Sequence, residues 1–337
     1  MESKLYHFYA TAISGLEEVV LDELRACLPG LEQVKLERGR RHGRIFFVYA
    51  RSPRHLLELR APLNLFALLA EVRQVTVGRP GMERLAARLE QVELQPALRL
   101  LRACGAQVDP KRFQLSTTLQ GAHRFARAEL AGRVQGLLAQ GHGLEPGGSR
   151  GVLRFHLQVE GNRALFGLQL APSRSHLLLE RGGLSGPLAW CMARLLPAAG
   201  REALVALGCS PAGVEEIARA CSPGRLVACA AERQRGPAGD WLVAQAGALP
   251  LRAACVELVL AAAVSSLEEL ARILKPGGVA ALLVAEPRAF AAAAREVGAF
   301  GVAARLPINI KGRRHLLLLL ERLAERDEEP LLQIERG

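Results

Sequence analysis

The sequence predicts two halves of different fold class, an α+β half over residues 1–171 and an α/β half over residues 188–324. In the first half, predicted strands and helices follow an order that begins β-α-β-β-α-β. In the second half, apolar strands and amphipathic helices alternate, which is typical of a parallel sheet covered by helices. Glycine and proline are frequent over residues 172–187, so this segment is predicted to be a linker.

Residues 1–80 predict a small unit with the ferredoxin-like order of elements. Strands are expected at Phe8–Ala12, Val34–Leu36, Arg44–Tyr49 and Val72–Val77, and helices from Gly15 onward and over Pro53–Leu59. The turn between the second and third strands, residues 38–43, carries three arginines and a histidine. These elements give the split βαβ arrangement of a self-contained α+β unit.

Residues 81–171 predict a second α+β unit. Helices are expected over Met82–Leu94 and Ala126–Ala139, and strands over Phe113–Thr118, Val152–Val159 and Ala164–Leu170. A glycine-rich loop over residues 141–151 separates the second helix from the last two strands. The N-terminal half is therefore expected to contain two modules in tandem.

Residues 188–324 predict the α/β domain, and residues 325–337 an acidic tail. Strands are expected at Ala203–Leu207, Arg225–Cys229, Val256–Leu260 and Val279–Val284, with helices over Leu188–Leu195, Val214–Ala220 and Leu267–Leu274. Gly277 and Gly278 are expected to form the turn between the last helix and strand. The segments Gly301–Leu306 and His315–Glu321 flank a turn and predict a terminal antiparallel hairpin.

The positive charge is concentrated in the N-terminal half. Residues 1–187 carry 26 Lys and Arg against 17 Asp and Glu, whereas residues 188–337 carry 18 against 16. Nearly all the basic residues are arginine, which binds phosphate through a planar fork and stacks on bases. The charge predicts that the N-terminal half binds a polyanion, although an arginine bias can also reflect GC-rich coding.

The seven cysteines are scattered singly, without a C-x-x-C pair or a neighbouring histidine cluster, so neither a metal site nor a disulfide framework is expected. The first residues have mixed polarity and lack the pattern of a signal peptide. The longest apolar runs are too short to span a bilayer. The expected protein is soluble and cytoplasmic, with the nucleus as the alternative location and no membrane partner.

Several segments resemble the THUMP-domain RNA methyltransferases, and within them the enzymes that methylate guanine N2 in tRNA or in a spliceosomal RNA. The start of the chain, Phe8–Glu18, is similar to the start of these proteins, and Phe113–Leu170 is similar to the THUMP module. The linker segment Arg181–Ala189 and the terminal Leu306–Gly312 also match in order and spacing. A parallel sheet that ends in one antiparallel strand is the layout of the methyltransferases that use S-adenosylmethionine.

The resemblance implies a division of labour between the two halves. The N-terminal half, a ferredoxin-like unit followed by a THUMP domain, would bind folded RNA, in tRNA through the acceptor stem and its 3′ end. The C-terminal half would be a Rossmann-like class I methyltransferase domain with S-adenosylmethionine as cofactor. Members of the family often depend on a small zinc-binding activator subunit, which is therefore an expected partner.

The cofactor-binding turn departs from the pattern of active relatives, Asp-Pro-x-x-Gly-x-Gly-Thr. The matching positions hold Leu207, Gly208, Pro211, Gly213 and Val214, so that one glycine is kept. A proline has no N–H and a fixed φ, which hinders the close approach of backbone to a ligand. Gly208 and Gly213 are therefore the candidate cofactor contacts that remain at this turn.

Other family positions are also changed. The acidic residue that would hold the ribose falls on Ala230, with Glu232 as the nearest substitute, and the third motif places Gln245 near the adenine. The fourth motif, Asn/Asp-Pro-Pro-Tyr/Phe, binds the target amine and stacks on the flipped base. Its positions hold Ala262, Ala263, Val264 and Ser265, which lack an amide, a carboxylate and an aromatic ring. No catalytic residue is assigned there, and methyl transfer is expected to be lost or weakened.

The candidate RNA contacts form three groups in the N-terminal half and the linker. They are Arg38, Arg40, Arg41 and Arg44 in the predicted turn, His123, Arg124 and Arg127 at a strand-to-helix junction, and Arg174 and Arg181 in the linker. A helix N-terminus favours anions, which supports the second group. The structural alternatives are a solvated turn for the first group and interdomain salt bridges for the third. Phe125 is expected to be a core residue, and Trp190 and Trp241 are expected to anchor packing.

Two function classes follow from the sequence. The first is an RNA-binding protein, with tRNA as the expected RNA, that has a largely inactive methyltransferase domain. The second is an active S-adenosylmethionine-dependent guanine-N2 RNA methyltransferase with divergent motifs. A third reading, a decayed gene product, would be supported by failure to bind tRNA.

Overall fold

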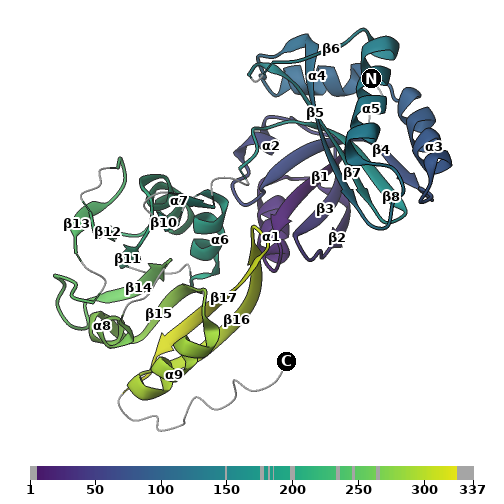
Figure 1. Ribbon diagram of the computed structural model, residues 1–337. Coiled ribbons are helices and arrows are strands. Elements are labelled where there is room, and N and C mark those ends of the chain that lie inside the picture. Colours follow the sequence, from purple (N-terminus) through teal and green to yellow (C-terminus); the bar gives the residue numbers. More distant parts are fainter. Residues whose placement is uncertain are drawn as a thin grey trace.

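The computed structural model describes residues 6–148, 150–174, 178–180, 183–184, 186–197, 202–232, 236–244, 247–262 and 266–324. Two large sheets organise these residues, one of eight strands in the N-terminal half and one of seven in the C-terminal half. Figure 1 shows the two halves side by side, with the purple and blue elements in one and the green and yellow elements in the other.

The N-terminal sheet begins with the predicted β-α-β-β-α-β order. Its elements are β1 (Tyr6–Ile13), α1 (Glu17–Cys27), β2 (Glu32–Glu37), β3 (His42–Tyr49), α2 (His55–Glu58) and β4 (Asn64–Arg73). The strands are antiparallel and lie in the order β2-β3-β1-β4. The fourth strand was predicted at Val72–Val77, which is wrong: the strand is Asn64–Arg73, because its apolar run precedes the polar segment that leads into the next helix.

The following elements extend the same sheet. They are α3 (Arg79–Glu90), α4 (Gln95–Ala103), β5 (Asp109–Gln120), α5 (Arg127–His142), β6 (Glu145–Pro146), β7 (Val152–Glu160) and β8 (Arg163–Gln169). Strand β8 pairs with β4, so the sheet runs in the order β2-β3-β1-β4-β8-β7-β5-β6. The two units predicted on either side of residue 80 therefore share one continuous sheet. Helix α4, with four buried apolar residues, was not predicted from the sequence.

The two faces of this sheet differ. One face packs against the helices, and its apolar side chains, such as Phe8, Phe47 and Leu157, belong to the main core together with residues of α1, α3, α4 and α5. The buried residues of the cluster on the opposite face, Tyr9, Phe46, Phe66 and Leu165, all come from strands. That second face also carries polar and charged side chains, which become important below.

The C-terminal sheet has the strand order β13-β12-β11-β14-β15-β17-β16. Its strands are β11 (Ala203–Leu207), β12 (Arg225–Ala230), β13 (Asp240–Val243), β14 (Val256–Ala261), β15 (Leu274–Val284), β16 (Phe300–Ile310) and β17 (Arg313–Arg322). The first five are parallel, and β17 is antiparallel to both of its neighbours. The predicted parallel sheet with a terminal hairpin is confirmed.

Helices cover the C-terminal sheet unevenly. They are α6 (Gly186–Leu195), α7 (Pro211–Cys221), α8 (Leu267–Ile273) and α9 (Pro287–Val297), and a short hairpin of β9 (Leu179–Glu180) and β10 (Gly183–Leu184) precedes them. Only residues 231–239 connect β12 to β13, which is shorter than the usual helical crossover between parallel strands. The predicted helix-to-strand turn at Gly277 and Gly278 is a bulge inside β15, between Leu274, which pairs with Val256, and Val279, which pairs with Leu258.

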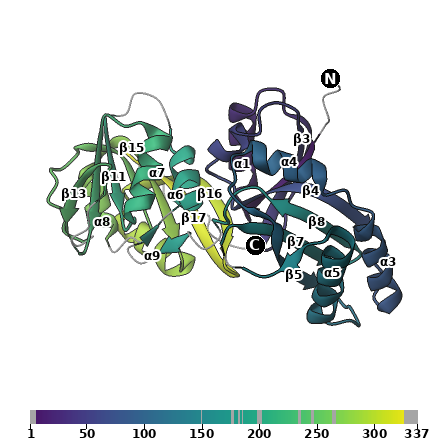
Figure 2. The ribbon, with the colours of Figure 1, turned by 90° about the horizontal axis from the view of Figure 1, so that it is seen from above.

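The two halves are in direct contact through the terminal hairpin and α6. The Asn309 N–H donates to the Ser14 carbonyl (3.2 Å), and Gly15, with φ +95°, lies so close to Pro307 that a Cβ would be 2.1 Å from its carbonyl oxygen. The main core is continuous across both halves. Figure 2 shows the yellow β16–β17 hairpin reaching the N-terminal half. The halves therefore form one packed body.

Candidate functional site

The first strand-to-helix turn of the C-terminal sheet is the position where the family pattern predicts cofactor contacts. Strand β11 ends at Leu207, the turn is Gly208–Ser210, and α7 begins with Pro211. Ser210, which is 2% exposed, caps the helix: its hydroxyl accepts from the Gly213 N–H (3.1 Å). Burial raises the pKa of the Cys209 thiol to about 12, so this cysteine stays protonated at neutral pH.

Strand β10 lies directly against this turn. The Leu184 N–H donates to the Gly208 carbonyl (2.9 Å), and the Ser210 N–H donates to the Leu184 carbonyl (2.9 Å). Gly183 has φ +113°, and a Cβ on it would lie 1.8 Å from the Gly208 carbonyl oxygen. The Gly208 carbonyl and the Ser210 N–H are therefore engaged by β10.

The end of the neighbouring strand β12 carries an alanine where a ribose-binding acid is expected. Ala230 is 8% exposed, and its carbonyl accepts from the Ala244 N–H (3.0 Å). Glu232 is exposed and two residues further on. A Cβ on Gly236 would lie 3.2 Å from both Pro211 Cβ and Trp241 Nε1, so the segment after β12 packs on the first residues of α7. Gln245 lies outside the described residues.

The described residues at this turn lack several groups that the family pattern uses to hold S-adenosylmethionine. The position that would hold the ribose has no acidic side chain, and the Ser210 N–H and Gly208 carbonyl are already paired with β10. Pro211 offers no N–H at the start of α7.

Among the described residues, no group of three His, Cys, Asp or Glu side chains could hold a metal ion. The same part of the chain contains no helix with the length and hydropathy of a membrane span.

A cavity of about 650 Å³ opens on the face of the N-terminal sheet that carries Tyr9 and Phe66, called here the strand-only face. Another cavity, of about 630 Å³, lies beside the ends of β14 and β15. The second is lined by Ala262, by apolar residues such as Leu283 and Phe290, and by Glu268 and Glu286. The Ala262 N–H donates to the Leu207 carbonyl (3.1 Å). The other fourth-motif positions, Ala263, Val264 and Ser265, lie outside the described residues.

The arginines of the first predicted RNA group differ in their surroundings. Arg40 and Arg41 are exposed, and Arg38 pairs with Glu18 (2.7 Å) on the surface. Arg44 is drawn onto the sheet: its side chain is 12% exposed and pairs with Glu160 (2.5 Å). Arg44 thus has a structural partner, whereas Arg40 and Arg41 extend into solvent.

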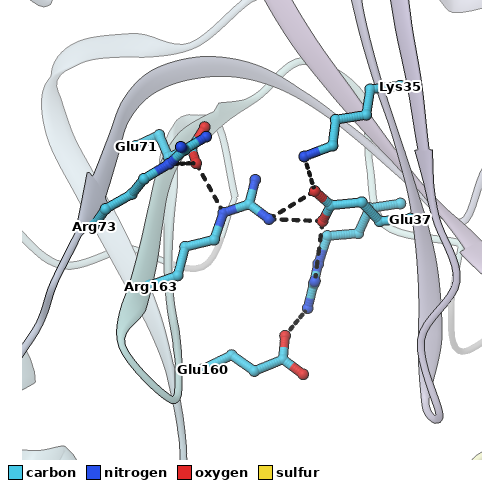
Figure 3. Close-up of polar contacts among 7 residues, drawn as sticks. Lys35, Glu37, Glu71, Arg73, Glu160 and Arg163 are labelled. Carbon is cyan, nitrogen blue, oxygen red and sulfur yellow. Dashed lines mark hydrogen bonds and ion pairs between the residues drawn. The ribbon is translucent and has the colours of Figure 1, made fainter.

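Arg44 belongs to a network of charges across five strands. Arg163 bonds both oxygens of Glu37 (2.8 and 2.7 Å) and pairs with Glu71 (3.1 Å). Figure 3 shows Arg163 between these two carboxylates, with Lys35 and Arg73 on either side. The Arg163 guanidinium also lies 4.9 Å from the centre of the Phe46 ring. The network holds the β2 edge to β4 and β8.

The second predicted group lies at the start of α5. Arg124 and Arg127 are exposed, whereas His123 is half-buried with its ring 5.0 Å from Phe125. Phe125 is 4% exposed, which confirms that it is a core residue. The structure therefore leaves Arg124 and Arg127 accessible to a partner and packs His123 against the core.

The linker arginines have different outcomes. Arg174 donates to the carbonyls of Leu59 (2.6 Å) and Arg60 (3.3 Å). Burial, together with the nearby charge of Arg60, lowers the pKa of Arg174. Its side chain therefore supports the chain between α2 and β4. Arg181 lies outside the described residues.

No model of a known protein family matches the chain. A curated relative, the tRNA (guanine(6)-N2)-methyltransferase of Thermus thermophilus, is 27% identical over 190 residues. The match covers 56% of this chain and 51% of the relative, so the chain matches about half the length of that protein.

Solved structures match over nearly the whole chain. TrmN from Thermus thermophilus aligns with 94% of this chain and 100% of its own, with a TM-score of 0.67 and 24% identity. A possible methylase from Clostridium difficile 630 aligns with 96% of this chain and 100% of its own, with a TM-score of 0.68 and 11% identity. The chain therefore shares the fold of these proteins across both halves, with a methyltransferase fold in the second.

Proposed function

We propose that this chain is an RNA-binding protein, with tRNA as its RNA class, in which the methyltransferase domain has lost or weakened methyl transfer. Residues 1–80 would be the ferredoxin-like unit and residues 81–171 the THUMP domain. Residues 172–187 would link them to the methyltransferase-like domain, residues 188–324. The sequence similarity to a tRNA (guanine(6)-N2)-methyltransferase supports the RNA class.

One observation carries the proposal of lost activity: β10 closes the turn at the head of α7. Gly183 packs on the Gly208 carbonyl, and Leu184 pairs with that carbonyl and with the Ser210 N–H. Each lost hydrogen bond to a cofactor costs ~1 kcal/mol, and a charged acceptor more. The alanine at position 230 adds to that loss, because no carboxylate is available for the ribose hydroxyls.

The exposed arginines support RNA binding by the N-terminal half. Arg40 and Arg41 follow β2, and Arg124 and Arg127 lie at the start of α5, Arg124 three residues before it and Arg127 as its first residue, where the helix N-terminus favours a phosphate. The net charge of this half is the more positive of the two. Contacts of this kind bind the RNA backbone and its shape rather than its sequence.

The alternative is an active S-adenosylmethionine-dependent guanine-N2 methyltransferase that works with divergent motifs. The cavity of about 630 Å³ beside Ala262 favours it, because a flipped base would enter the domain near this strand end. A small zinc-binding activator subunit is the proposed partner of either form.

Binding of total tRNA tests the proposal. We expect tRNA to bind in a gel-shift assay, and the double variants Arg40→Glu/Arg41→Glu and Arg124→Glu/Arg127→Glu each to weaken binding by about tenfold, since each removes phosphate contacts. No label should pass from methyl-labelled S-adenosylmethionine to the tRNA, with or without an activator subunit.

The matched control is Arg288→Glu/Arg295→Glu on α9, which makes the same charge change on exposed residues of the other half. It should bind tRNA like the wild type. Equal weakening by the control would contradict the proposed RNA surface. Failure of the wild type to bind tRNA would also contradict it. Transfer of label to tRNA would establish the alternative.

A further inference from the structure

The tip of the C-terminal hairpin, residues 311–314, is a tight turn that carries exposed positive charge. Lys311 and Gly312 connect β16 to β17 with φ +51° and +86°, the pair of positive φ values typical of a two-residue type I′ hairpin. The Gly312 N–H donates to Asn309 Oδ1 (2.8 Å), which fixes the turn. Arg313 and Arg314 follow it, and both arginines are exposed, as is Lys311.

The charges of this hairpin tip are not neutralised by the protein. In the part of the chain that the structure describes, the side chains of Lys311, Arg313 and Arg314 form no ion pair, whereas Arg225 of the same half pairs with Asp240 (3.3 Å). Three like charges on one tight turn repel each other. An anion that binds at the tip therefore gains attraction from all three.

Ser14 holds the hairpin tip close to the turn after β2, residues 38–41. Its carbonyl accepts from the Asn309 N–H (3.2 Å), and its hydroxyl donates to the Gly39 carbonyl (2.6 Å). Ser14 and Asn309 form an antiparallel bridge, and the preceding Ile13 pairs with His42 of β3. Neighbouring strands lie ~4.8 Å apart, so the backbones of the tip and the turn are about 10 Å apart. Figure 2 shows the hairpin reaching the N-terminal half.

The turn after β2 brings exposed cations of its own to this junction. Arg40 and Arg41 are exposed and form no ion pair with any described residue. The acids at the start of α1 are used within the fold: Glu17 is 3% exposed and accepts from the Gly15 N–H, and Glu18 pairs with Arg38. The junction therefore presents positive charge from both halves on one surface.

This surface lacks the apolar centre that a protein interface requires. The large apolar side chains that the described residues expose come from neither turn; they are Val34, Val77, Leu179 and Val243. Guanidinium and ammonium groups without an apolar neighbour match the phosphates of a nucleic acid backbone.

We infer that the hairpin tip and the turn after β2 together bind the phosphate backbone of one folded RNA, which crosses from the N-terminal to the C-terminal half at this junction. The inference rests on the proposed RNA-binding function and adds to it a contact in the C-terminal half. A folded RNA carries its phosphates along a fixed path, so two rigid turns at a fixed distance can contact it together.

The salt dependence of tRNA binding tests the contact at the tip. Lys311→Asn/Arg313→Gln/Arg314→Gln removes the three charges, and asparagine suits the positive φ of the turn. Fluorescence anisotropy with labelled tRNA should show binding about tenfold weaker than in the wild type at about 0.1 M salt. The slope of log K against log salt should decrease by about 2, since each lost phosphate contact removes about 0.7–0.9.

The matched control is Arg252→Gln/Arg288→Gln/Arg295→Gln, which removes the same charge from exposed residues elsewhere in the C-terminal half. It should bind tRNA within about twofold of the wild type with the same slope. Arg313→Lys/Arg314→Lys keeps the charge and should bind within about threefold. The single variants Arg313→Gln and Arg314→Gln leave the turn itself unchanged, and each should lower the slope by about 0.8.

The outcomes separate this contact from the proposed function. Wild-type affinity and slope in the tip variants would overturn the contact and leave RNA binding with the N-terminal half. Equal weakening by the control would also overturn it, because the effect would then follow from net charge alone. Failure of the wild type to bind tRNA would remove the proposed function itself.

Discussion

Gly183→Ala is expected to lower the free energy of unfolding by ~3 kcal/mol or more and to release β10 from the turn at the head of α7. Two causes add together. Alanine is strained at φ +113°, and its Cβ would lie 1.8 Å from the Gly208 carbonyl oxygen, where backbone rather than a side chain would have to move. Large losses of this kind follow when a special backbone geometry is broken.

Denaturant unfolding and hydrogen exchange read by mass spectrometry measure this effect. The amides of Leu184 and Ser210, which hold β10 to the turn, should lose about two orders of magnitude of protection. Gly312→Ala is the control, because Gly312 also has positive φ (+86°) but nothing within 4 Å of the added Cβ. It should cost ~1 kcal/mol and leave the turn protected. Unchanged protection in Gly183→Ala would refute the closed turn.

Glu23→Ala is expected to cost ~3 kcal/mol, because it removes the acceptor of two backbone N–H groups near the contact between the halves. Glu23 is 4% exposed and accepts from Arg60 N–H (2.9 Å) and Ala61 N–H (2.8 Å). Leaving buried donors unpaired costs ~1–3 kcal/mol each. Chemical denaturation measures the loss. Asp22→Ala, on the same helix and exposed, should change stability by less than ~0.5 kcal/mol.

The contribution of Glu23 to the stability of the fold depends on pH with a definite sign. Burial raises the pKa of Glu23, partly offset by the Arg60 and Ala61 N–H groups, so the folded protein holds this proton more tightly than the unfolded chain. Its contribution to stability is complete below the ordinary pKa of 4.5 and declines as the pH rises through the raised value. The stability of the wild type relative to Glu23→Gln should therefore fall as the pH rises from 4.5. A constant difference would contradict the burial.

The parallel sheet and its terminal hairpin could be predicted because apolar runs such as Leu204–Leu207 and Val279–Val284 are bounded by clear turn residues. Strand β13 was missed, since Asp240–Val243 is short and only partly buried. The fourth N-terminal strand was misplaced because Asn64–Arg73 closely follows Pro62 and its apolar run, Leu65–Ala70, has no alternation. Pairing of β4 with β8 depends on tertiary contacts that a linear pattern does not contain.

The candidate sites could likewise be predicted only in part. Exposure of Arg40, Arg41 and Arg124 follows from their places beside turns, but the ion pair of Arg44 with Glu160 joins residues far apart in sequence. The cavity on the strand-only face was also missed. Its one sequence signal is the polar alternation of Gln114, Ser116, Thr118 and Gln120, which places four polar side chains on one face of β5. Its partners on β1, β4 and β7 emerge only from the sheet order.

Calorimetric titration of the folded protein with S-adenosylmethionine tests most directly whether the methyltransferase fold of this chain has lost its cofactor site. With β10 on the turn and alanine at position 230, we expect no heat of binding up to about 1 mM cofactor. Saturable binding with a Kd of about 10 μM or tighter would contradict the account and favour the alternative, an active methyltransferase with divergent motifs.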